Sequence, residues 1–173
     1  MEKLVVNGGK RLEGKVKISG AKNAVLPIIA ASLLGTSPSI LEEVPDLEDV
    51  RTISEVLGHL GVKVSNGGNN TLNIDSSVIS SCEAPYELVR KMRASYYLVG
   101  ALLGRYKSAK VELPGGCAIG VRPMDQHIKG FEALGAKVTM DHGSISAKAE
   151  KLIGANIFFD VVSVGATINV MLA

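Results

Sequence analysis

Short runs of β-branched residues alternate along the chain with longer stretches whose apolar residues recur at helical spacing. This pattern predicts a mixed α/β (α+β) fold. Strands are expected at residues 4–6 and 15–18, and a buried, leucine-rich helix over residues 24–34. Pro27 lies inside that helical stretch, so we expect it to fall in the first turn, where its missing N–H costs nothing.

A strand, a helix and a hairpin follow. The strand is expected at residues 39–42, and Asp46 is the predicted N-cap of the helix, which Gly61 should end. Residues 62–64 and 71–74 flank a glycine- and asparagine-rich stretch, which is typical of a hairpin. The apolar face of the helix is predicted to be Leu47, Val50, Ile53, Val56, Leu57 and Leu60.

The same order of elements then recurs. The second set is a helix over residues 85–103 that Gly104 should end, a strand at 109–112, a helix from Pro123 to Leu134, and a hairpin of 136–140 and 145–149. Leu34-Gly35 matches Leu103-Gly104, and Gly61-Val62-Lys63-Val64 matches Gly135-Ala136-Lys137-Val138. We therefore expect an internal duplication.

A third copy is expected to start with a strand at residues 156–159 and the string Ser163-Val164-Gly165-Ala166, followed by the opening turns of a helix over residues 167–173. That helix has room for two or three turns before Ala173, which would leave its apolar face uncovered. We therefore expect the 173 residues to be part of a longer natural protein.

Composition narrows the function classes. Apolar residues make up 46% of the chain, enough for a core, and the net charge of +2 comes without a run of like charges, which argues against nucleic acid as a partner. The two cysteines, Cys82 and Cys117, form no disulfide or zinc pattern, so a reducing cytoplasm is expected. We expect neither a signal peptide nor a membrane-spanning helix, because the longest near-apolar run, residues 24–34, is too short to cross a bilayer.

The second copy carries a glycine-rich strand-to-helix loop that the first copy lacks, over residues 113–123. Glycines around Cys117 allow close approach by a ligand, and nearby Arg122 could lower the pKa of the thiol or bind an anion. The alternatives are a small, half-buried cysteine and a solvated arginine.

Polar residues stand at the expected helix starts of all the copies. Lys22 precedes the first helix, Lys91-Met92-Arg93 occupies the equivalent place in the second copy and Ser163-Val164-Gly165 in the third. These residues could therefore face one shared cleft that binds a phosphate. The alternative is that Lys22 is simply exposed. His127 has no second ligand at suitable spacing, so we expect no metal, and the hydrolase motif GxSxG is absent.

These strings together resemble the enolpyruvyl transferases, and among them the UDP-N-acetylglucosamine 1-carboxyvinyltransferases, along essentially the whole chain. The resemblance rests on Gly20-Ala21-Lys22-Asn23-Ala24, Arg93-Ala94-Ser95, Pro114-Gly115-Gly116-Cys117-Ala118-Ile119-Gly120 with Arg122-Pro123, and Ser163-Val164-Gly165-Ala166-Thr167. It implies an inside-out α/β barrel of repeated βαβαββ units, here two units and the start of a third. Residues 1–20 would then belong to a second, mostly missing domain, and 21–173 to the domain that carries the cysteine loop.

The resemblance also implies an activity: enolpyruvyl transfer from phosphoenolpyruvate to the 3-hydroxyl of UDP-N-acetylglucosamine, with release of phosphate, in cytoplasmic peptidoglycan synthesis. No cofactor is implied. Cys117 would be the proton donor and the residue that fosfomycin alkylates. Phosphoenolpyruvate would contact Lys22, Asn23 and Arg122, and the UDP-sugar would contact Arg93, Arg122, Pro123, Asp125, His127, Ser163, Val164 and Gly165.

The sequence departs from the family pattern at one position, and alternative functions stay open. Some members carry a lysine where this chain has Val161-Val162, so one diphosphate contact could be missing. The family's general base lies in the missing domain, so we expect the chain alone to be inactive. The alternatives are the sister 3-phosphoshikimate enolpyruvyl transferase, a non-catalytic nucleotide-sugar-binding module, and a redox-sensing thiol domain.

Overall fold

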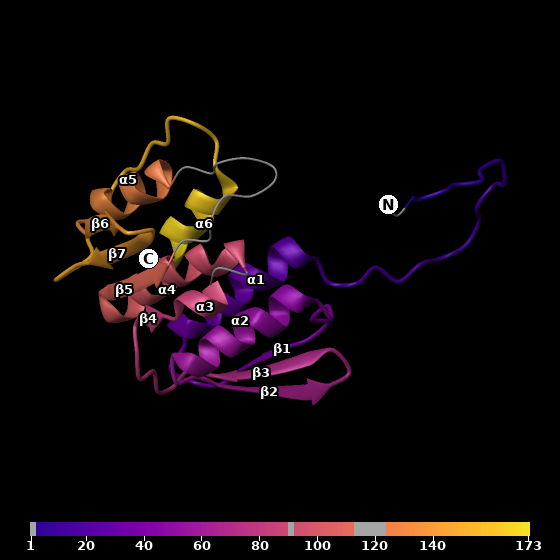
Figure 1. The fold of residues 1–173 in the computed structure, drawn as a ribbon, viewed down its shortest axis with the longest axis horizontal. Coiled ribbons are helices and arrows are strands. Elements are labelled where there is room, and N and C mark those ends of the chain that lie inside the picture. Colours follow the sequence, from indigo (N-terminus) through magenta and orange to yellow (C-terminus); the bar gives the residue numbers. More distant parts are fainter. Residues whose placement is uncertain (1–2, 90–91, 113–123) are drawn as a thin grey trace.

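The computed structural model describes residues 3–89, 92–112 and 124–173. Figure 1 shows two sheets on the outside of the molecule, with helices packed between and beside them, so the mixed α/β prediction is confirmed. The elements are α1 (Lys22–Ala31), η1 (Ser32–Leu34), β1 (Ser39–Leu41), α2 (Glu48–His59), β2 (Lys63–Gly68), β3 (Thr71–Asp75), β4 (Glu83–Ala84), α3 (Tyr86–Val89), η2 (Arg93–Tyr96), α4 (Tyr97–Tyr106), β5 (Ser108–Glu112), α5 (Asp125–Ala133), β6 (Lys137–Asp141), β7 (Ser144–Lys148) and α6 (Val164–Leu172).

The two sheets repeat one topology. The first has the strand order β1-β3-β2, and the second has β5-β7-β6 in the same antiparallel arrangement, with β4 added in parallel beside β5. Each set consists of a helix, a strand, a second helix and a hairpin, as the duplication in the sequence predicts. Among the described residues, the strands form these two separate open sheets.

Both predicted hairpins form, and the backbone φ angles of the turn residues explain their turns. Asn69 and Asn70 have φ of 46° and 59°, and His142 and Gly143 have φ of 46° and 83°. Positive φ at both central residues matches the right-handed twist of the flanking strands. Strand β2 runs further than expected, into the stretch that the sequence suggested was turn, with an irregularity between Asn66 and Gly68.

Helix α2 buries the face that its spacing predicts: Val50, Ile53, Val56, Leu57 and Leu60 are buried, and Leu47 packs against the core. Gly61 ends this helix with φ of 93°, as predicted. The predicted cap is wrong, because Leu47 occupies the N-cap position without a side-chain bond. The Asp46 carboxylate instead accepts a hydrogen bond of 2.7 Å from Arg51.

The long helix expected over residues 85–103 is wrong in its continuity and its end. The chain forms the short helix α3, then η2 and α4. Gly104 lies inside α4, which ends at Lys107 with φ of 59°. A Cβ on Gly104 would lie 2.4 Å from the carbonyl oxygen of Leu172, so this glycine serves the close approach of α6 and not a helix end.

Pro27 also lies elsewhere than expected. Helix α1 begins at Lys22, two residues earlier than predicted, which places Pro27 in the second turn. Because proline has no N–H, the carbonyl of Asn23 lacks its helical donor, and the proline ring itself is buried. The earlier start brings Lys22 and Asn23 into the first turn of the helix.

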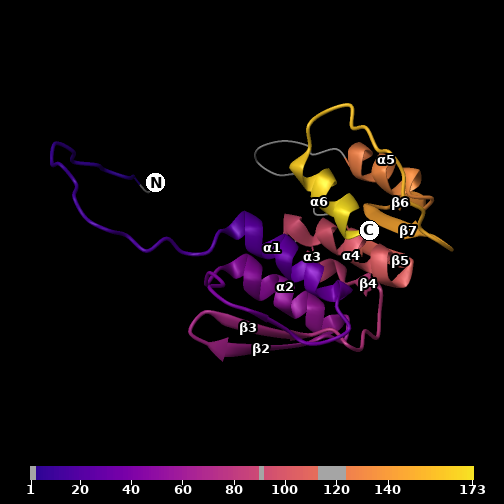
Figure 2. The same cartoon turned by 180° about the vertical axis from the view of Figure 1, so that it is seen from behind.

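Two predicted strands at the N-terminus and one near the C-terminus do not form. Residues 3–21 leave the body as an extended segment, and Figure 2 shows this from behind. Leu4 and Ile18 are 94% and 88% exposed, because no neighbouring strand in the described structure supplies backbone partners. Residues 156–159 are likewise irregular.

Candidate functional site

A cleft of about 570 Å³ opens where several helix starts meet, and it holds four of the residues that the sequence singled out. Lys22 and Asn23 come from the first turn of α1, and Val164 and Gly165 from the first turn of α6. In Figure 2 these two helix starts lie on the same side of the molecule, near the point where the N-terminal segment leaves the body. The other lining residues are Leu26, Pro27, Asp49, Ala94, Tyr96 and Tyr97.

The start of α1 gives the cleft its positive character. Ala21 precedes this helix without a side-chain cap, and its carbonyl accepts from the N–H groups of Ala24 and Val25. The N–H groups of Lys22 and Asn23 have no hydrogen-bond partner among the described residues. Free N–H groups and the positive end of the helix dipole together favour an anion here.

Lys22 adds a full charge to this helix start, and it is paired. Its ammonium contacts the carboxylate of Asp49, from the first turn of α2. The Lys22 side chain is 55% exposed, so an incoming anion can reach it, whereas Asp49 is 23% exposed. An anion in the cleft therefore competes with Asp49 for the ammonium.

Tyr96 forms the wall between the starts of α4 and α6. A Cβ on Gly165 would lie 2.9 Å from the Tyr96 hydroxyl, so the absence of a side chain lets the phenol lie across this helix start. The Tyr96 ring stands edge-on to His127, with 5.0 Å between centroids. His127 thus lies directly behind a residue that lines the cleft.

The start of α6 is held from both sides. Ser163 caps this helix, its hydroxyl accepting a hydrogen bond from the Ala166 N–H at 3.2 Å. Before it, Asp160 is tied to α5: its carboxylate lies 2.7 Å from the Lys129 ammonium, and its N–H donates to Gln126. The hydrogen bond from Lys129 is the main reason why the pKa of Asp160 lies below its usual value.

His127 is buried in the first turn of α5. Burial lowers its pKa to about 4, although the nearby Asp125 carboxylate opposes that shift. Asn169 of α6, which is fully buried, lies 3.0 Å from Nδ1 of His127. The histidine is therefore neutral at physiological pH.

The sequence-predicted site residues fall into three groups. Lys22, Asn23, Val164 and Gly165 line the cleft, and Ser163 and His127 support it from behind. Asp125 is exposed in the first turn of α5, and Arg93 begins η2, next to the cleft-lining Ala94. The predictions for Cys117, Arg122 and Pro123 fall outside the described residues.

Sequence reasoning missed Asp49, Tyr96 and Asn169. Asp49 lies in the first turn of α2 and pairs with Lys22 at the start of another helix, a contact between residues 27 positions apart. Tyr96 directly follows the Arg93-Ala94-Ser95 string, which was a usable signal. Nothing local marks Asn169, because its partners lie 42 to 73 residues away.

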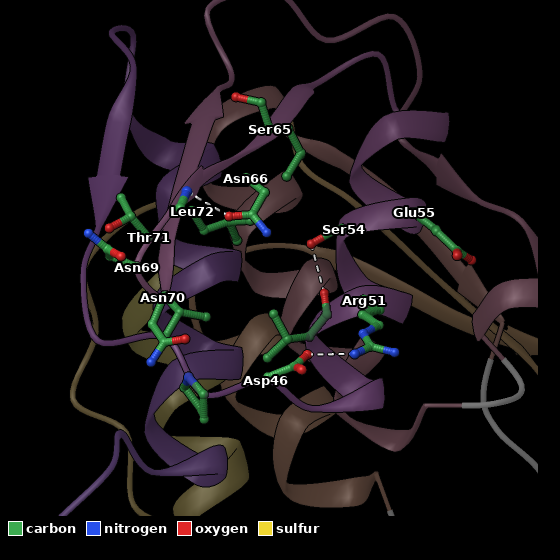
Figure 3. Close-up of a pocket in the computed structure, with 15 residues that line it drawn as sticks. Asp46, Arg51, Ser54, Glu55, Ser65, Asn66, Asn69, Asn70, Thr71 and Leu72 are labelled. Carbon is green, nitrogen blue, oxygen red and sulfur yellow. Dashed lines mark hydrogen bonds and ion pairs between the residues drawn. The ribbon is translucent and has the colours of Figure 1, made fainter. Parts of the chain in front are cut away.

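A second, larger groove of about 790 Å³ lies between α2 and the β2–β3 hairpin, and Figure 3 shows its polar lining. Asp46 and Arg51 lie next to each other in its lining and pair at 2.7 Å, so their charges compensate each other. None of the site residues predicted from the sequence lines this groove. The cleft at the helix starts is therefore the better candidate for an anionic ligand.

Other features concern metals, thiols and membranes. Within the described ranges, no group of three or more His, Cys, Asp or Glu side chains is arranged to hold a metal ion. Cys82 is half-buried, and burial raises the pKa of its thiol, with the charge of Glu83 acting in the same direction. None of the described helices is both long and apolar enough to cross a bilayer.

The fold is that of the enolpyruvyl transferases. The chain belongs to the family described as EPSP synthase (3-phosphoshikimate 1-carboxyvinyltransferase), whose model matches residues 6–173. A UDP-N-acetylglucosamine 1-carboxyvinyltransferase of Clostridium botulinum is 60% identical over 174 residues, covering 100% of this chain and 42% of the relative. The UDP-N-acetylglucosamine 1-carboxyvinyltransferase 3 of Caldanaerobacter subterraneus is 56% identical, covering 100% of this chain and 41% of its own length. The chain thus spans about two fifths of the length of these relatives.

Solved structures agree on the fold. The enolpyruvyl transferase NikO from Streptomyces tendae is similar with a TM-score of 0.68 and 26% identity, over 84% of this chain and 32% of that one. An EPSP synthase from Acinetobacter baumannii has a TM-score of 0.68 over 92% of this chain and 37% of that chain. Its 16% identity supports the likeness of fold alone.

Proposed function

We propose that this chain is the cysteine-loop part of a cytoplasmic UDP-N-acetylglucosamine 1-carboxyvinyltransferase, which transfers enolpyruvyl from phosphoenolpyruvate to the sugar 3-hydroxyl in peptidoglycan synthesis. The observation that carries the proposal is the cleft where Lys22, Asn23, Val164 and Gly165 meet. Identity of 56–60% to enzymes of that name, over the whole chain, supports the choice of substrates.

The cleft suits an anionic substrate. Lys22 and the free N–H groups at the start of α1 would hold the phosphate or carboxylate of phosphoenolpyruvate, with Asn23 and Arg122 beside them. Their positive charge would stabilise the negative charge of departing phosphate. The UDP-sugar would bind along Arg93, Arg122, Pro123, Asp125 and His127 and at the start of α6, with Ser163, Val164 and Gly165.

The chemistry needs a proton donor and a proton acceptor. Cys117 would protonate the methylene carbon of phosphoenolpyruvate while the sugar hydroxyl loses its proton and adds to the neighbouring carbon. Phosphate would then leave the tetrahedral intermediate as a proton is removed from the new methyl group, which restores the carbon–carbon double bond in the product. The general base for the hydroxyl would come from a second domain. The extended segment 3–21, with exposed Val6 and Val16, supports a strand role in that domain.

Fosfomycin should alkylate Cys117 and spare Cys82. A thiol in a glycine-rich loop near cationic groups is more reactive than a half-buried thiol whose pKa burial has raised. We expect mass spectrometry to show one adduct on Cys117, formed faster with UDP-N-acetylglucosamine present, and none in Cys117→Ser. Equal labelling of both cysteines, or no adduct at all, would contradict the proposed function.

The substitution Lys22→Met should weaken phosphoenolpyruvate binding about tenfold, because an ion-pair contact between the ammonium and the substrate is lost. Calorimetry with UDP-N-acetylglucosamine present measures this affinity. Asp49→Asn should have the opposite effect, since it frees the Lys22 ammonium and removes a negative charge from the cleft. Lys17→Met is the matched control, because Lys17 also pairs with a carboxylate, that of Glu43, but outside the cleft. Unchanged affinity in Lys22→Met would exclude this lysine from the site.

The sister activity on 3-phosphoshikimate is the second candidate, because the family carries that description. The cysteine loop and the Arg122-Pro123 string with Asp125 and His127 resemble the UDP-sugar enzymes instead. A competition experiment distinguishes the two activities. UDP should displace bound UDP-N-acetylglucosamine from the chain, whereas shikimate 3-phosphate should not. The reverse outcome would move the chain to the shikimate branch.

A further inference from the structure

A buried polar cluster joins α4, α5 and α6 directly behind the cleft. Figure 1 shows α6 lying between α5 and α4. At this crossing Asn169 is fully buried and His127 is 6% exposed. A buried amide is costly unless its oxygen and its NH₂ group both find partners, so the contacts of Asn169 specify a single orientation.

Backbone groups of η2 and α4 fix which way the amide faces. The Oδ1 atom of Asn169 accepts a hydrogen bond of 2.8 Å from the Gly100 N–H. Its Nδ2 atom donates to the carbonyl of Tyr96 at 2.9 Å. Turning the amide over would set oxygen against a carbonyl and NH₂ against an N–H, so the reverse orientation is excluded.

This orientation determines where the proton of His127 lies. Nδ2 of Asn169 is 3.0 Å from Nδ1 of His127. Because an amide NH₂ donates and cannot accept, Nδ1 must be the acceptor and carries no proton. The neutral imidazole therefore has its hydrogen on Nε2, and that atom has no hydrogen-bond partner among the described residues.

We propose that Asn169 is a positioning residue of the site: it holds His127 as a neutral imidazole whose Nε2–H is a donor for the diphosphate of the nucleotide substrate. This inference rests on the proposed function. Burial acts in the same direction, since it keeps the pKa of His127 at about 4, so the ring stays neutral across the physiological range. The ring lies against Tyr96, which lines the cleft, and in the first turn of α5, where helix N–H groups also favour a phosphate.

The tautomer can be measured without any ligand. Long-range ¹H–¹⁵N spectra of the ¹⁵N-labelled chain at pH 7.5 and at pH 5.5 should show His127 with its proton on Nε2 at both values. The exposed His59 and His142 provide reference signals in the same spectra. A proton on Nδ1, a mixture of tautomers, or an imidazolium at pH 5.5 would overturn the proposal.

Substitution of Asn169 tests the coupling. A carboxylate in Asn169→Asp can accept but not donate, so the His127 proton should move to Nδ1 and its pKa should rise. If this variant does not fold, Asn169→Ser, which removes the donor to Nδ1, should give a mixture of tautomers. A fixed Nε2–H tautomer in the folded variant would show that Asn169 does not set it.

Titration with UDP separates this inference from the proposed function. We expect UDP to shift the Nε2–H signal of His127, and Asn169→Asp to weaken UDP binding about tenfold, the typical effect of losing a hydrogen bond to a charged group. His59→Gln, at the exposed end of α2, should bind as the unaltered chain does. If UDP binds without moving the His127 signal, the donor role is wrong and the proposed function stands. If UDP does not bind, the proposed function and the donor role both fail, and the tautomer still decides whether Asn169 orients the ring.

Discussion

Replacing Gly100 with alanine should destabilise the protein by about 3 kcal/mol or more, because an overpacked contact between backbones cannot relax cheaply. A Cβ at this position would lie 2.2 Å from the carbonyl oxygen of Asn169 and 2.3 Å from its Oδ1. Gly104, one turn later on the same face of α4, meets Leu172 of α6 in the same way, at 2.4 Å. The two glycines form the groove in which α6 lies, so the midpoint of urea denaturation should fall sharply.

Gly58 provides the matched control. It also lies in a helix, α2, but nothing stands within 4 Å of where its Cβ would be. Gly58→Ala should therefore stabilise the chain by about 0.5–1 kcal/mol through helix propensity alone. A loss of less than about 1 kcal/mol in Gly100→Ala would show that α4 and α6 do not pack this closely in solution.

Replacing Arg105 with methionine should cost about 3 kcal/mol, because several backbone carbonyls lose a charged donor. The guanidinium of Arg105, at the end of α4, donates to the carbonyls of Leu33, Gly35 and Ser76 at 2.7–2.8 Å. These carbonyls belong to the first repeated unit, so the side chain ties the two units together. Arg105→Lys should recover part of the loss, since one ammonium cannot replace the planar fork.

Arg51→Met is the control for Arg105. Arg51 is also an arginine with a short contact, 2.7 Å to Asp46, but both side chains are exposed. Exposed ion pairs contribute little to the free energy of unfolding, so Arg51→Met should leave the midpoint of thermal unfolding nearly unchanged. Equal effects of the two substitutions would show that the carbonyl contacts of Arg105 do not stabilise the fold.

Where the fold follows from local pattern, the sequence predicted it well. The apolar face of α2, the glycine that ends this helix and both hairpin turns depend on residues within a few positions of one another. Helical spacing and positive φ at glycine or asparagine act over that range. The duplication was visible because the same local signals recur in the same order.

Errors arose where a distant contact decides the structure. Gly104 resembles a helix end in the sequence, but it lies within α4, where α6 approaches it. Residues 4–6 and 15–18 have the composition of strands, yet a strand needs a neighbour for its backbone, and the described structure supplies none there. The error at Asp46 has a local cause instead: this residue was expected to cap α2, and it pairs with Arg51, five residues further along the chain.

The sequence by itself determined the mixed α/β fold, the repeated unit and the motifs that contain Lys22, Asn23, Val164 and Gly165, because these depend on short-range spacing and on motifs. Tertiary structure alone decided that these starts line one cleft, that Asp49 competes for the Lys22 ammonium, and that Tyr96 forms the wall. It also decided the tautomer of His127, through an amide 42 residues away in the chain. The physical reason is that ion pairs and buried hydrogen bonds depend on distances of about 3 Å, which the packing of helices sets and local spacing does not.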